Sequence, residues 1–284
     1  MIQAQLALPA PHDVTVGYTE WGRPGAAQTV ICVHGLTRNA RDFDFLARAL
    51  ADRNARVIAL NMVGRGTSSW LADPAGYIVP AYAGHVLQFL KEQRLDSVDW
   101  VGTSMGGLIG MLIAAGENSP IRRLVLNDIG PFISQAALAQ LKTYVGRDPH
   151  FATLDEAEAY LRDIHAGFGP LTDSQWRHLA SHSIREADGG LRLHYDPQIK
   201  VPYAQMADAD VDLWALWEKI RCPTFLLRGS ESQLLTSETA SRMTETGPKA
   251  TLATIYGVGH APALMADDQI ALIAGWLRPG STKD

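Results

Sequence analysis

The sequence has few cysteines, and this scarcity excludes one class of protein. Only two of the 284 residues are cysteine, Cys32 and Cys222, and both fall in apolar runs that predict strands. Two buried free thiols fit this pattern better than a disulfide framework does. A small secreted fold held together by disulfides is therefore excluded, and a reducing compartment is expected.

The sequence also lacks a basic run and a long apolar run. Lys+Arg number 25 against 30 Asp+Glu, for a net charge of −5. Without clustered positive charge we expect no nucleic-acid or anionic-membrane partner. No apolar run approaches the roughly 20 residues of a membrane helix. The first residues have neither a basic start nor a long apolar core, so we expect no signal peptide and a soluble, cytoplasmic protein.

Short β-branched and aliphatic runs alternate with amphipathic stretches that have helical spacing, near residues 43–52, 82–93 and 105–117. The middle runs are nearly all apolar, as in a parallel sheet covered by helices on both faces. The pattern predicts a doubly wound α/β fold entered by an antiparallel hairpin. Its predicted strands lie near residues 2–8, 14–21, 28–33, 56–60, 98–103, 122–127, 223–228 and 250–255.

Residues 131–218 interrupt this alternation with helical patterns and almost no strand, apart from a weak one near 191–195. Gly/Ser-rich linkers are absent at both ends. We therefore predict a helical cap over the carboxyl edge of the sheet, inserted into a core domain of residues 1–130 and 219–284. Candidates for an apolar pocket wall in this cap are Phe132, Leu138 and Trp176.

The strongest chemical signal is Gly102-Thr103-Ser104-Met105-Gly106, a G-x-S-x-G pattern between a predicted strand and an apolar helix. So sharp a turn strains the serine backbone, and flanking glycines avoid the clashes that side chains would cause. The turn lifts Oγ above the sheet and points the helix N-terminus toward developing negative charge. Ser104 is therefore the predicted nucleophile.

A serine nucleophile needs a base, and nine histidines are candidates. His260 follows the last predicted strand in a glycine-containing loop, Y-G-V-G-H-A-P, which lets the imidazole reach back over the sheet edge. His34 follows an early strand, and we interpret it as a brace for its loop. The remaining histidines are expected to be surface or packing residues: His12, His85, His150, His165, His178, His182 and His194.

Two acids could orient the histidine, since the acid should lie between the nucleophile and the base in this chain order. Asp128 directly follows the strand near 122–127. Glu231 follows a later strand, but it stands one residue before the position where many hydrolases carry Asp, which here is Ser232, followed by Gln233. We favour Asp128 and keep Glu231 as the alternative.

Tetrahedral intermediates need two preorganised N–H donors. Met105, directly after the nucleophile, and Leu36, in the loop V-H-G-L, are the candidates. Residues 37–43 are expected to border the pocket. The two-glycine loop at 61–68 should lie beside the nucleophile, but it lacks the Lys-Ser/Thr ending of a phosphate loop. Without H-E-x-x-H or paired C-x-x-C spacing, no metal or cofactor is implied.

These segments together resemble the α/β-hydrolase superfamily over nearly the whole chain. The matching pieces are VHGLTRNARDF, NMVGRGTS, VGTSMGGLIG, LVLNDIGP, PTFLLRGSE and YGVGHAP. The resemblance implies an eight-stranded sheet, a helical cap between the sixth and seventh strands, and a triad of Ser104, Asp128 and His260. The LNDIGP segment is similar to bacterial carboxylesterases that place the acid after the sixth strand. Asn61, where many relatives have Asp, departs from the pattern, as Ser232 does.

The expected activity is hydrolysis of a small to medium apolar ester through an acyl-enzyme, with only substrate and water as partners. Alternatives with the same triad are a lactonase or enol-lactonase, a C–C hydrolase of ring-cleavage products, and a cofactor-free haloperoxidase. Ser104 argues against dehalogenase and epoxide hydrolase chemistry, which uses an Asp nucleophile. A ligand-sensing protein on the same scaffold stays open, because fold does not fix function.

Overall fold

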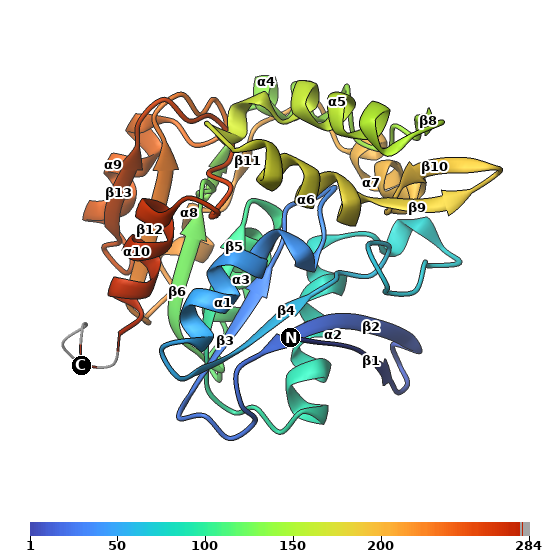
Figure 1. Ribbon diagram of the computed structural model, residues 1–284. Helices are drawn as coiled ribbons and strands as arrows, with labels where there is room; N and C mark the ends of the chain where they lie inside the picture. The colour runs from blue at the N-terminus through green and yellow to red at the C-terminus, as the bar shows by residue number, and fades with distance from the viewer. Residues whose placement is uncertain (279, 281–284) are drawn as a thin grey trace.

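The computed structural model of the protein describes residues 1–278 and 280. Its centre is an eight-stranded sheet with the order β1-β2-β4-β3-β5-β6-β12-β13 (Figure 1). β2 pairs antiparallel with β1 and β4, and all other neighbours are parallel. All eight predicted strands are present, with bounds that differ by at most one residue: β1 (Ile2–Leu8), β2 (Val14–Trp21), β3 (Gln28–Val33), β4 (Ala55–Leu60), β5 (Val98–Thr103), β6 (Ile121–Asn127), β12 (Thr224–Gly229) and β13 (Thr251–Ile255).

Both faces of the sheet are covered by helices, as the apolar strands predict. Successive side chains of a strand point to opposite faces. In β3, Val30 and Cys32 therefore join the core under α1 and α10, whereas Ile31 and Val33 join the core under α2 and α3. The helices around the sheet are α1 (Asp44–Ala51), α2 (Val79–Glu92), α3 (Met105–Ala114), α8 (Trp214–Trp217), α9 (Ser237–Glu245) and α10 (Asp267–Trp276), with the 3-10 helices η1 (Ala40–Phe43) and η2 (Pro74–Gly76).

Both cysteines are free thiols, but only one lies in a strand. Cys32 is buried in β3, and burial raises its pKa. The prediction of a strand at Cys222 is wrong, since Cys222 lies two residues before β12. Pro223 separates it from the strand and has no N–H to extend the ladder. Among the described residues, no helix is both long and apolar enough to cross a bilayer.

Residues 132–212 lie across one end of the sheet (Figure 1), whereas α8, the end of the predicted cap, lies beside the sheet. Side chains of this segment and the loops that follow β3 and β5 line one cavity, so the covered end is the carboxyl edge of the parallel strands. The segment contains more strand than predicted, because strands of two to four residues are too short to show alternation. Its elements are β7 (Phe132–Ile133), α4 (Gln135–Lys142), β8 (His150–Phe151), α5 (Leu154–Ile164), η3 (Ala166–Phe168), α6 (Asp173–Ser183), β9 (Ile184–Ala187), β10 (Gly190–Leu193), η4 (Pro197–Ile199), α7 (Lys200–Gln205) and β11 (Val211–Asp212).

The loop after β4 fastens this segment to the rest of the molecule. Arg65 and Tyr195 form an isolated antiparallel bridge. The N–H of Asp196 donates to the carbonyl of Gly64 at 2.8 Å. The hydroxyl of Tyr77 donates to the Asp196 carboxylate at 2.6 Å. Backbone and side-chain hydrogen bonds therefore join the two parts at this edge.

A buried ion pair ties the amino ends of β5 and β6 to the end of α10. Asp99 is fully buried and accepts from Arg123 (2.6 and 2.9 Å), Arg122 (3.0 and 3.2 Å) and Gln28 (2.8 Å). Arg123 also donates to the carbonyl of Leu277 at 2.9 Å. Burial raises the pKa of Asp99, but the hydrogen bonds from the two arginines and Gln28, together with the charge of Arg123, hold that pKa below its usual value.

We expect Asp99→Asn to lower the free energy of unfolding by about 3–5 kcal/mol at neutral pH, because the buried charge of Arg123 loses its partner. Asp208→Asn, which removes an exposed partner of Lys142, should change the stability far less, because solvent screens that pair. Urea unfolding measures both.

The depressed folded-state pKa also sets a pH dependence. The wild type should hold this stabilisation above the ordinary carboxyl pKa of about 3.9, and lose it as the pH falls through the lower folded-state value. Equal losses for the two variants at pH 7 would contradict the assignment.

Candidate active site

Ser104 lies on the turn between β5 and α3, as predicted. Its backbone has φ 51° and ψ −114°, a region that residues other than glycine rarely adopt. The flanking glycines are required by close approach. A Cβ on Gly106 would lie 2.0 Å from the carbonyl oxygen of Val33, and a Cβ on Gly102 would lie 2.3 Å from that of Gly106. The G-x-S-x-G pattern therefore reflects packing of the turn against β3 and α3.

His260 and Asp128 complete a hydrogen-bonded chain with Ser104. Nε2 of His260 lies 2.9 Å from Oγ of Ser104, and Nδ1 lies 2.7 Å from Oδ2 of Asp128. An ionised carboxylate only accepts hydrogen bonds, so this contact assigns the imidazole proton to Nδ1. Nε2 is then free to accept the hydroxyl proton of Ser104. Three segments that are distant in sequence thus meet at the carboxyl edge of the sheet.

The surroundings of Asp128 distinguish it from Glu231. Asp128 is fully buried, and its carboxylate accepts from the N–H of Gly229 at 2.8 Å and from the hydroxyl of Ser232 at 2.6 Å. Ser232 occupies the position where an acid was expected, and there it holds the carboxylate of Asp128. Glu231 is exposed at the border of the cavity. The structure therefore brings Asp128, and not Glu231, into contact with His260.

The two candidate oxyanion donors flank the serine. Met105 is the first residue of α3, and the first N–H groups of a helix have no acceptor within it. Leu36 lies in the loop after β3 and lines the cavity. The peptide that carries the Leu36 N–H is fixed at its other end, because the carbonyl of Gly35 accepts from Nδ1 of His34 at 2.6 Å.

His34 braces this loop, as predicted. Its Nε2 accepts the N–H of Met62 at 3.0 Å, which leaves the proton on Nδ1 for the contact with Gly35. Burial lowers the pKa of His34 to about 3, so the imidazole is neutral near pH 7. His34 thus joins the loops after β3 and β4.

Arg65 is a site residue that the sequence did not reveal. It is fully buried and donates to the carbonyl of Leu36 at 2.9 Å, while its Nη2 lies 3.8 Å from Sδ of Met105. It also donates to the hydroxyl of Tyr82. A buried guanidinium beside both candidate oxyanion donors favours negative charge there. The N-M-V-G-R-G-T-S motif located this loop, but it did not show which way the arginine points.

Asn61 explains one departure from the family pattern. Its Oδ1 accepts the N–H of Ala40 at 2.8 Å, and its Nδ2 donates to the hydroxyl of Thr67 at 3.1 Å. An aspartate could accept but not donate. The amide therefore serves both partners and joins the loop after β4 to η1.

A cavity of about 280 Å³ opens over Ser104 and His260. Its wall is mixed. Leu141, Tyr144 and Ile164 supply apolar surface. Arg38 and Thr37 lie on the core side, and they alone of the expected border, residues 37–43, line the cavity. The segment that covers the carboxyl edge of the sheet (residues 132–212, the covering segment) contributes polar groups, including Gln140 and His165.

The prediction of the apolar pocket wall is wrong in its residues. None of the three side chains named for it lines the cavity. Trp176 packs instead with Leu179 and Met265, and Leu138 belongs to the main core. Phe132 pairs with Asp212 in the two-stranded sheet. Helical spacing showed that these residues are apolar, but it could not show which neighbour each one faces.

His165 was expected to be a surface or packing residue, but it lines the cavity. Its ring stacks on Phe168 with centroids 4.4 Å apart. Burial lowers the pKa of His165 well below its usual value, and the nearby charge of Arg38 lowers it further. Arg38 is itself paired with Asp42 at 2.6 Å. The cavity therefore presents a neutral imidazole and a charge-balanced arginine close to Ser104.

The site joins a serine on a strained turn, a histidine and a buried acid by hydrogen bonds. Hydrolases of several folds use this arrangement to activate a serine. The family model of the α/β hydrolase fold matches residues 28–265, and the chain belongs to this family.

Several proteins that are similar to this chain are described as hydrolases. The chain is 41% identical over 266 residues to the 3-hydroxybutyrate-oligomer hydrolase of Cupriavidus necator, with 90% of each chain covered. A solved structure described as a hydrolase from Rickettsia typhi is 34% identical, with a TM-score of 0.89 over 98% of both chains. An α/β hydrolase from Novosphingobium aromaticivorans is 31% identical, with a TM-score of 0.84 over 96% of this chain and 97% of that one.

Replacing the acid tests the choice between Asp128 and Glu231. Asp128→Asn should lower kcat by about 10⁴, because the imidazole loses the partner that fixes its tautomer. Glu231→Gln should leave kcat near the wild-type value. Steady-state kinetics on an ester substrate measures both. Normal turnover by the Asp128 variant beside an inactive Glu231 variant would overturn the assignment.

His34→Ala should lower kcat by about 10²–10³, the effect of losing one oxyanion donor, because the Leu36 peptide is then no longer held in place. KM should change little. His85→Ala is the matched control, since His85 is also a buried histidine but lies on α2. If both variants lose activity in proportion to their stability, His34 has no role beyond packing.

Proposed function

We propose that the protein is a serine hydrolase that cleaves carboxylic esters through an acyl-enzyme. The observation that carries the proposal is the chain of contacts from Asp128 to Nδ1 of His260 (2.7 Å) and from Nε2 to Oγ of Ser104 (2.9 Å). A serine hydroxyl is a weak nucleophile unless a base accepts its proton. Here the base lies within hydrogen-bond reach, and its tautomer is fixed by the acid.

In the first half of the reaction, Oγ of Ser104 attacks the ester carbonyl while Nε2 of His260 takes the hydroxyl proton. The N–H groups of Leu36 and Met105 hold the oxyanion, and Arg65 behind them stabilises the same charge. The tetrahedral intermediate then collapses. The C–O bond to the alcohol breaks, and Nε2 returns its proton to the leaving oxygen.

In the second half, water enters the place that the alcohol has left. Nε2 of His260 takes one proton from water as its oxygen attacks the acyl carbon. Collapse of this second intermediate breaks the bond to Oγ, which recovers its proton from the imidazole. The products are an acid and an alcohol, and the enzyme is restored without a cofactor in any step.

For the substrate we propose short oligoesters of a hydroxy acid such as 3-hydroxybutyrate. The name of the Cupriavidus necator relative, which is 41% identical over 90% of the chain, supports this class. A cavity of about 280 Å³ is at the small end of ligand pockets. Its mixed wall suits a short chain with ester and hydroxyl oxygens better than a long alkyl chain. In this proposal, residues 131–218 act as the cap that covers the reacting ester.

Wild type and Ser104→Ala should be compared on linear dimers and trimers of 3-hydroxybutyrate and on p-nitrophenyl esters of increasing acyl length. We expect turnover by wild type only, a preference for short acyl groups, and higher kcat/KM on the oligoesters. Turnover that survives Ser104→Ala would overturn the nucleophile.

Inactivity toward every ester by a folded protein would contradict ester hydrolysis. A vinylogous diketone and a small lactone should then be assayed, because the C–C hydrolase and lactonase alternatives keep the same triad. Binding of these compounds without product release would favour a ligand-sensing protein.

A further inference from the structure

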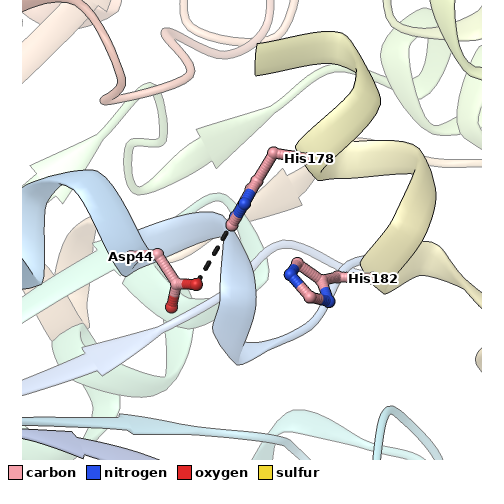
Figure 2. Close-up of side chains that lie close together, drawn as sticks. All are labelled: Asp44, His178 and His182. Atoms are coloured by element: carbon pink, nitrogen blue, oxygen red, sulfur yellow. Dashed lines mark ion pairs between the residues drawn. The ribbon is translucent and has the colours of Figure 1, made fainter. Parts of the chain in front are cut away.

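A second cluster of ligand-type side chains lies where α6 meets the start of α1 (Figure 2). His178 and His182 are one helical turn apart on α6, and Asp44 is the first residue of α1. Each residue offers one nitrogen or oxygen atom, and these atoms all lie within 4.8 Å of one another. None of the three residues lines the cavity over Ser104. The cluster is therefore separate from the candidate active site.

The carboxylate of this cluster lacks part of its hydrogen bonding. Asp44 is 6% exposed, and its Oδ1 has no hydrogen-bond partner among the residues that the structure describes. A buried carboxylate oxygen without a partner is costly, so such an atom points to a missing ligand. The other oxygen, Oδ2, lies 3.5 Å from Nε2 of His178 (Figure 2). That nitrogen also donates to the carbonyl of Arg41 at 3.0 Å, so a bound ion would have to replace this hydrogen bond and its proton.

Arg41 now supplies the positive charge at this place. Its Nη2 lies 2.6 Å from Oδ2 of Asp44, and its Nη1 lies 3.4 Å from Nδ1 of His182. A guanidinium only donates, so Nδ1 of His182 is the acceptor and its lone pair faces the guanidinium of Arg41. Burial, Arg41 and His178 together lower the pKa of His182 to about 4, which keeps the imidazole neutral. A carboxylate and an imidazole lone pair thus already converge on one cation.

We propose that Asp44, His178 and His182 form a binding site for a divalent transition-metal ion of the Zn²⁺ type, which replaces the guanidinium of Arg41. Imidazole and carboxylate are ligands that Zn²⁺ prefers, with bonds of about 2.0–2.2 Å. The three atoms must close to roughly 3.3 Å apart for tetrahedral geometry at these bond lengths, with water as the fourth ligand. The side chain of Arg41 is 17% exposed and so has a path to solvent.

The site goes beyond the proposed ester hydrolysis and does not depend on it. Asp44 belongs to the core, whereas both histidines belong to the segment that covers the sheet edge. A bound ion would therefore link these two parts of the molecule. Neither the catalytic steps nor the substrate requires this link. Because the ion binds the folded chain and the ligands separate on unfolding, it should also raise the melting temperature.

Co²⁺ is the first probe, since its visible absorption is far more intense in tetrahedral than in octahedral coordination. Metal-free protein is titrated with Co²⁺ and followed by the visible spectrum, and then with Zn²⁺ by calorimetry. The variants are His182→Gln, which removes a ligand, and Arg41→Gln, which removes the competing charge. His150→Gln is the matched control, because His150 is an exposed histidine of the same segment. Circular dichroism verifies that each variant is folded.

We expect one ion per chain, a tetrahedral Co²⁺ spectrum and unchanged binding in His150→Gln. His182→Gln should weaken binding by more than about tenfold, since even outer partners of metal ligands contribute that much, and Arg41→Gln should tighten it. Ser104→Ala should bind the ion as wild type does, whether or not it hydrolyses esters. Binding that is absent, or that is equally strong in folded His182→Gln, would overturn the proposal.

Discussion

The hydrogen bond between the buried carboxylate of Asp128 and Nδ1 of His260 is the interaction on which the rest of the site depends. A charge buried this deeply is tolerated only where every oxygen is matched by donors, and Gly229 and Ser232 supply them from the loop after β12. The carboxylate therefore ties the ends of β6 and β12 to the loop after β13. That junction places the imidazole next to the half-buried Ser104 on its turn.

The parts of this structure that depend on local sequence were predictable. Eight strands show their alternation or apolar runs directly, and Ser104 is marked by glycines that the turn needs for steric reasons. His260 and Asp128 follow from chain order and from strand ends, because parallel strands bring their carboxyl ends to one edge. The departure at Ser232 favoured Asp128, the acid that contacts His260, although the hydroxyl contact of Ser232 with that acid could not be foreseen.

The remainder depends on side-chain direction, which no periodicity specifies. Arg65 lies in a motif that the sequence located, but its contacts with Leu36 and Met105 require the loop after β4 to fold back over two other loops. Trp176 is an apolar side chain of the kind expected in a pocket wall, but it packs away from the pocket. His165 is a polar side chain of the kind expected at the surface, but it lines the pocket. His178 and His182 are a helical turn apart in any helix, yet only α1 brings Asp44 to them.

The loop after β4 contacts both the loop that carries Leu36 and the segment that covers the sheet edge. Arg65 holds the carbonyl of Leu36 on one side and pairs through its backbone with Tyr195 on the other. A change in the covering segment at Tyr195 would therefore be transmitted to the peptide groups above the serine. Residues 62–66 and 194–196 are joined by backbone hydrogen bonds, so a substitution in either loop would act on the shape of the other.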